Sequence, residues 1–210
     1  MNESWTDGRT VDLTLDVMDI VVIKGSTPDE RDRMWVTRSD GSTDQVPINM
    51  VHDLPHLVVE SALGLRFGFW GLIDAGAFAR EISASHGRDA GRVKAGRSGV
   101  LMGRPHHSPL ADEAVDALVV EHEEELIAAK ALTNAFRFQA RQSPQAVRDR
   151  LATAAMANAI VRAKLAILDD ATIEDMQGAL ADADREWASV PPGGRIGLRW
   201  PLATLRRSGG

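Results

Sequence analysis

Hydrophobic and polar residues alternate near both ends of the chain. Residues 11–17 place Val or Leu at every second position, and residues 33–38 and 195–200 alternate in the same way. Residues 20–23 form a short run of Ile and Val. A period of two predicts half-buried strands, and β-branched runs favour strands as well. Because an isolated hairpin is only marginally stable, we expect residues 195–200 to join the N-terminal strands in one small antiparallel sheet.

The middle of the chain follows helical periodicity. Residues 51–85 predict one or two helices, interrupted by the glycine-rich sequence LGLRFGFWGL. Residues 111–141 carry apolar side chains three and four positions apart, which predicts one long amphipathic helix.

Two further helices are predicted from their N-terminal signals. Ser143 followed by Pro144 is typical of an N-cap and the first helical residue, and the apolar pattern then continues to about residue 168. Thr172 predicts the cap of a shorter helix that ends near residue 188, with acidic residues in its first turn.

The predicted fold class is therefore α+β. We expect a bundle of about four helices over residues 50–188, packed with a small antiparallel sheet that residues 1–49 and 191–202 form together. Residues 86–108 hold five glycines and five basic residues, which predicts a flexible basic loop. We expect one domain over residues 1–210.

The amino-acid composition excludes several kinds of site and partner. The chain has 210 residues, 44% of them hydrophobic, and no cysteine. The missing cysteine excludes disulfides, thiolate catalysis and any metal site built on sulfur. The formal net charge of −6 makes nucleic acid an improbable partner.

No stretch approaches the roughly 18 consecutive apolar residues of a membrane-spanning helix. The first residues also lack the basic and apolar regions of a secretory signal. We therefore expect a cytoplasmic protein without a membrane partner.

The strongest chemical pattern is the sequence VHDLPHLVVE. In a helix, His52, His56 and Glu60 are spaced i, i+4 and i+8, so their side chains share one face. Two imidazoles one turn apart can chelate a divalent cation. Pro55 opposes a helix interior, and if Asp53 were the N-cap, His52 would fall outside the helix and only His56 and Glu60 would remain paired.

The string HDxxH resembles the short metal-binding motif of a family of ubiquinone-biosynthesis proteins. That resemblance covers five residues and implies a divalent metal held by His52 and His56. The acidic residue that the family carries further downstream is missing here, because Gly68 occupies the matching position.

A second helix adds to this pattern. His122 falls on the apolar stripe of residues 111–141, with Glu125 near the same face, and Asn158 falls on the stripe of the following helix. Inward-facing imidazoles and carboxylates are how helical bundles build metal sites.

The first functional hypothesis is a metal-dependent hydrolase. Its predicted metal ligands are His52, His56, Glu60 and His122, and the metal would be Zn, Fe, Mn or Ni. Asp53 or Glu125 would act as the base for a metal-activated water, or would orient a ligand.

The second hypothesis is a non-catalytic interaction or regulatory protein. In that case the same residues form a buried polar network that binds no ligand. The apolar surface would then serve a protein partner or a second copy of the chain in a homodimer.

Overall fold

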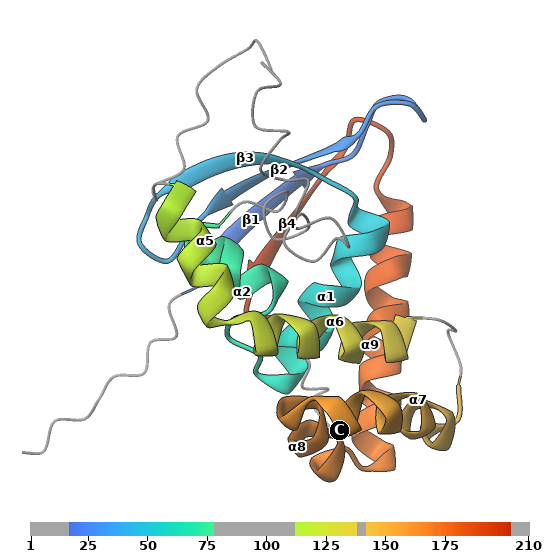
Figure 1. Cartoon of the computed structure of the whole chain (residues 1–210). Helices are drawn as coiled ribbons and strands as arrows, with labels where there is room; N and C mark the ends of the chain where they lie inside the picture. The colour runs from blue at the N-terminus through green and yellow to red at the C-terminus, as the bar shows by residue number, and fades with distance from the viewer. Residues whose placement is uncertain (1–16, 78–111, 138–141, 203–210) are drawn as a thin grey trace, which may run out of the picture.

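The computed structural model describes residues 17–77, 112–137 and 142–202, and within them the fold is α+β (Figure 1). Four antiparallel strands form one sheet in the order β3-β2-β1-β4. Their bounds are β1 Met18–Ile23, β2 Asp32–Thr37, β3 Thr43–Ile48 and β4 Arg195–Trp200. The register places Val21 opposite Trp35 on one side and opposite Gly197 on the other.

The prediction that a C-terminal strand joins the N-terminal strands in one sheet is confirmed. β4 pairs with β1 along its whole length, and its apolar residues point inward as the alternation predicts. β3 was not predicted, because TDQVPI is rich in polar residues and contains Pro47. A proline lacks the amide donor but is tolerated on an edge strand, which is where β3 lies. Of the predicted strand at residues 11–17, residues 11–16 lie outside the described residues.

The glycine-rich sequence interrupts the first helical segment as predicted. α1 spans Met50–Leu63 and ends at Gly64, whose positive φ of 60° is the left-handed conformation that closes many helices. α2 spans Phe69–Asp74. Asn49 is the N-cap of α1, so Asp53 is not the cap and His52 lies inside the helix despite Pro55.

Two other predicted helices are each divided in two. Residues 111–141 contain α5 Asp112–Glu121 and α6 Glu123–Arg137, which separate at His122. The segment after Ser143 contains α7 Pro144–Ala157 and α8 Ala159–Ile167, which separate at Asn158. α9 spans Asp170–Ser189.

Asn158 is buried, as its predicted core-facing position implies, but the prediction that it lies inside a continuous helix is wrong. Asn158 ends α7 and caps α8: its Oδ1 accepts from Val161 N at 2.9 Å, and its Nδ2 donates to Glu124 O at 2.9 Å. The predicted cap of the last helix is also displaced, since Asp169 accepts from Thr172 N at 2.7 Å and is the N-cap of α9. The described residues thus hold seven helices, and a bundle of four is not confirmed.

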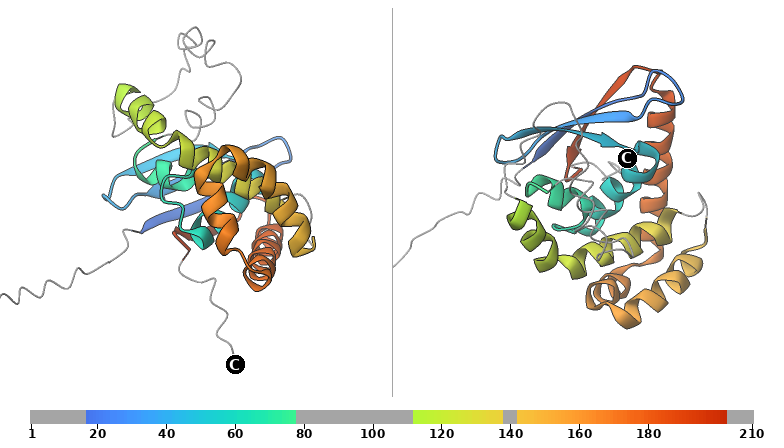
Figure 2. Two further views of the ribbon diagram at one scale, coloured as in Figure 1. Left: turned by 60° about the horizontal axis from the view of Figure 1, so that its bottom comes forward. Right: turned by 45° about the horizontal axis from the view of Figure 1, so that its top comes forward.

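The helices lie on one side of the sheet, with α1 and α2 nearest to it and α7 and α8 farthest away (Figures 1 and 2). No helix in the described ranges is long and apolar enough to cross a membrane. The predicted basic loop at residues 86–108 lies outside those ranges.

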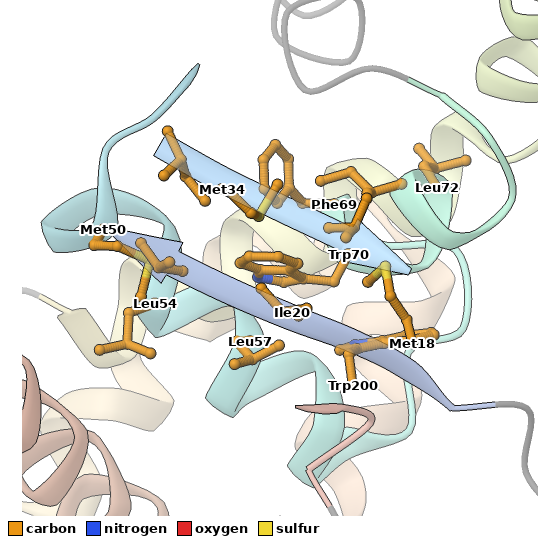
Figure 3. Close-up of a cluster of buried hydrophobic side chains, with 14 of the residues drawn as sticks. Met18, Ile20, Met34, Met50, Leu54, Leu57, Phe69, Trp70, Leu72 and Trp200 are labelled. Atoms are coloured by element: carbon orange, nitrogen blue, oxygen red, sulfur yellow. The ribbon is translucent and has the colours of Figure 1, made fainter. Parts of the chain in front are cut away.

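Two apolar cores meet at α1. Met50, Leu54 and Leu57 of α1 pack with the inner face of the sheet and with α2, where Trp70 is fully buried (Figure 3). Val58 and Val59 join a second core formed with α6, α7, α8 and α9. α1 therefore ties the sheet to the helical layer, and polar side chains on its buried faces have to find partners within the protein.

Candidate functional site

His56 and Glu60 form a buried pair on α1. They are one helical turn apart, and their exposed fractions are 8% and 0%. His56 Nδ1 lies 3.3 Å from Glu60 Oε1 and 3.3 Å from Thr133 Oγ1, which comes from α6. The cluster thus joins α1 to α6 through polar contacts at the boundary of the two cores.

Glu60 also binds the beginning of α2. Its Oε1 accepts from Phe69 N at 2.8 Å, and its Oε2 accepts from Trp70 N at 2.9 Å. The first amides of a helix have no partner within the helix, and a carboxylate satisfies them well. The Glu60 carboxylate thus replaces the side-chain cap that Gly68 does not supply.

The close approach of Glu60 requires a glycine at position 68. A Cβ added to Gly68 would lie 2.4 Å from Glu60 Cδ and 2.6 Å from Oε2. Gly68 is the residue at which the chain departs from the metal motif that HDxxH resembles. In this fold, that departure leaves room for the carboxylate beneath α2.

Burial dominates the electrostatics of Glu60. Removal from water raises the pKa of its carboxyl above the ordinary value of 4.5, although the hydrogen bonds from His56, Trp70 and Phe69 act in the opposite direction. The raised pKa means that the folded protein holds the Glu60 proton more tightly than the unfolded chain does.

His52 and Asp53 form a second pair, at the surface end of α1. The His52 side chain is 51% exposed, and its Nδ1 lies 2.7 Å from Asp53 Oδ1. Asp53 Oδ2 accepts from Asn49 N at 3.0 Å and so satisfies an amide at the start of the helix. The rings of His52 and His56 are neighbours, with centroids 5.7 Å apart.

His122 and Glu125 both contact the segment between α1 and α2. The His122 ring stacks on the Phe67 ring at a centroid distance of 3.6 Å, and Glu125 Oε1 accepts from Phe67 N at 3.0 Å. These contacts give both residues a structural role in holding Phe67 against the junction of α5 and α6.

The structure thus brings together four of the six predicted site residues along α1, as the pairs His52–Asp53 and His56–Glu60. It places His122 and Glu125 on Phe67. Across residues 17–77, 112–137 and 142–202, no three or more His, Asp or Glu side chains are grouped so that they could hold a metal ion. All three carboxylates of Asp53, Glu60 and Glu125 accept backbone amides instead.

A groove lies on a different face of α1, between α1, α9 and β4. Its volume is about 480 Å³. Helices α1 and α9 supply most of its lining, and β4 and the residue Leu202 supply the rest. The lining residues are Met50, Leu54, Leu57, Val58, Glu174, Asp175, Gly178, Ala179, Asp182, Ala183, Glu186, Trp187, Ile196, Leu198 and Leu202.

Sequence reasoning missed this groove. The acidic residues between 169 and 184 resemble an ordinary solvated helix face, which is how they would be interpreted from the sequence alone. The available signal was the set of small residues Gly178, Ala179 and Ala183 among them, because small side chains on a helix leave space at its surface.

Comparison with protein-family models, curated proteins and solved structures finds no match to this chain. Two regions of the molecule are therefore candidates for a functional site: the polar cluster of His56, Glu60 and Thr133, and the groove.

The raised pKa of Glu60 predicts a specific pH dependence of stability. Below pH 4.5 the carboxyl is protonated in both the folded and the unfolded state. As the pH rises above that value, the unfolded chain loses the proton first, so the folded state binds more protons and its stability falls. We expect the unfolding free energy of the wild type, relative to that of Glu60→Gln, to decrease with rising pH.

Urea denaturation of both proteins between about pH 4 and pH 8 measures this difference. Glu174→Gln removes an exposed carboxyl and is the matched control. A difference between wild type and Glu60→Gln that stays constant, or that grows with pH, would contradict the assignment.

Proposed function

We propose that this protein is a non-catalytic binding protein, and that the groove between α1, α9 and β4 receives an apolar segment of a protein partner. The observation that carries the proposal is the groove itself. Its volume is about 480 Å³, and its lining combines apolar and acidic side chains.

The groove extends along much of α9. Its lining on α9 runs from Glu174 to Trp187, which at 1.5 Å per residue is roughly 20 Å along the helix. Ile196 and Leu198 of β4 and the residue Leu202, all half-buried, provide apolar contacts. Burial of a partner's apolar side chains there would contribute about 25 cal/mol for each Å² removed from water.

The polar cluster supports a non-catalytic role. Glu60 is engaged by two backbone amides and by His56, so its oxygens are already used by the protein. His56 Nδ1 is likewise shared between Glu60 and Thr133. A network of this kind holds α1 in place, and α1 is one wall of the groove.

Gly178 offers a direct test of the groove. A Cβ at this position meets no atom within 4 Å, so an alanine fits without a clash. Gly178→Ala should raise stability by about 1 kcal/mol through helix propensity and leave most of the groove open. Gly178→Leu should fold as well but project into the groove.

The probe is a synthetic amphipathic helical peptide of about 16 residues with a leucine face and zero net charge, titrated by calorimetry. We expect binding to the wild type, an affinity within about threefold for Gly178→Ala, and at least a tenfold loss for Gly178→Leu, which is about 1.4 kcal/mol. Equal binding to the wild type and Gly178→Leu, or no binding to any of the three, would refute the proposal.

A metal-binding function is the second candidate, and one observation favours it. His52 and His56 are ring neighbours, and Asp53 and Glu60 engage their Nδ1 atoms. Carboxylates that hold Nδ1 in this way orient the Nε2 atoms of metal-binding histidines. Two imidazoles are fewer than the three protein ligands of a typical catalytic zinc site.

His52→Ala separates the two candidates, because His52 is half exposed and its loss should disturb the fold little. The binding-protein account predicts that Zn²⁺ or Ni²⁺ leaves the melting temperature of the untagged wild type unchanged. A rise that is present in the wild type and absent in His52→Ala would establish the metal site instead. His56→Ala is less informative, since it also removes a buried partner of Glu60.

A further inference from the structure

The rim of the groove is acidic. Four carboxylates of α9 line it, namely Glu174, Asp175, Asp182 and Glu186, and none of the described residues that line it is basic. All four lie at exposed positions. Asp182 is paired with Arg185 of the same helix, whereas Glu174, Asp175 and Glu186 form no ion pair with any residue in the described ranges.

Three of the four acidic residues lie beyond the small residues that form the hollow, and the fourth, Asp182, lies between Ala179 and Ala183. Glu174 and Asp175 precede Gly178, and Glu186 follows Ala183. The groove therefore presents an apolar floor between two regions of negative charge. A ligand that matches it carries apolar side chains in the middle and positive charges toward its ends.

We infer that the occupant is a basic amphipathic α-helix of a protein partner. This inference rests on the proposed function and specifies the class of partner. The carboxylates of Glu174, Asp175 and Glu186, which form no ion pair within the part of the chain that the structure describes, would bind Lys or Arg side chains at the two ends of the helix. Its apolar face would lie against Gly178, Ala179 and Leu198, which are half-buried.

The groove favours a helix over an extended segment. Twelve of the fifteen lining residues in the described ranges belong to α1 and α9, whose backbone amides and carbonyls are already bonded within the helices. An extended peptide would find few backbone partners on these two helices, whereas a helix brings its own hydrogen bonds. Gly178 and Ala179 also let a second helix axis approach closely.

The test uses three peptides with the same leucine face as the neutral probe described above, and with net charges of about +6, zero and −6. Each exposed ion pair changes affinity by about two- to fivefold, so three pairs predict roughly an 8- to 125-fold preference for the basic peptide over the neutral one at low salt. That preference should shrink markedly at about 1 M salt, where charges are screened beyond about 3 Å.

A charge-reversal variant supplies the matched control. Glu174→Lys combined with Glu186→Lys should abolish the preference for the basic peptide and improve binding of the acidic one. Asp184→Lys makes a similar change on α9 at an exposed residue outside the groove, and should leave the three affinities in their original order.

The outcomes separate this inference from the proposed function. If none of the peptides binds, the proposed function fails and the inference fails with it. If all three bind with equal affinity and Gly178→Leu abolishes binding, the groove is a binding site but the partner is not basic. Self-association of the wild type that is lost in Gly178→Leu would make a second copy the occupant and overturn the inference.

Discussion

A carboxylate that is buried away from water needs hydrogen-bond donors within the protein, and the arrangement around Glu60 follows from that requirement. Two of the donors are the first amides of α2, and the third partner is His56 on the preceding turn of α1. These hydrogen bonds fix the position of the segment between α1 and α2. The Glu60 carboxylate can approach this segment only because Gly68 lacks a side chain. Trp70, the central aromatic residue of the core beneath the sheet, lies two residues after Gly68 (Figure 3).

The surface of α1 has three parts with different contacts. One part packs on the sheet, another packs on the helical layer, and the polar cluster of His56 and Glu60 lies between them. Where α1 faces α9 without filling the space between them, the groove opens. A rigid α1 is thus needed both for the fold and for the shape of the groove, which explains why buried polar residues can be important here without performing catalysis.

The sequence predicted the elements with strong periodicity and missed the places where local hydrogen bonds override it. β1, β2 and β4 follow from alternation, and the helical character of the middle follows from its 3.6-residue period. The break at Asn158 could not be read from that period, because the asparagine bonds to Glu124 of a distant segment as well as capping α8. The edge strand β3 lacks the apolar alternation of a buried strand, so the pattern gave no signal for it.

The candidate site was predictable only within one helix. The i, i+4 spacing correctly brought His56 to Glu60, since helix geometry determines which residues share a face. Whether His122 contacts this pair depends on the packing of α1 against α5 and α6, which the spacing of residues in the sequence does not predict. In the structure His122 stacks on Phe67. The groove depends on three separated segments, α1, α9 and β4, and no local pattern encodes their meeting.

The central claim is that ligand binding occurs in the groove and that the polar cluster is structural. Hydrogen–deuterium exchange in the presence and absence of the basic amphipathic peptide tests it most directly. We predict slowed exchange in residues 174–187 and 50–58, with no change in residues 60–70 and 122–133. Protection centred on residues 60–70 and 122–133 instead would contradict the account, because it would place the ligand at the His56–Glu60 cluster.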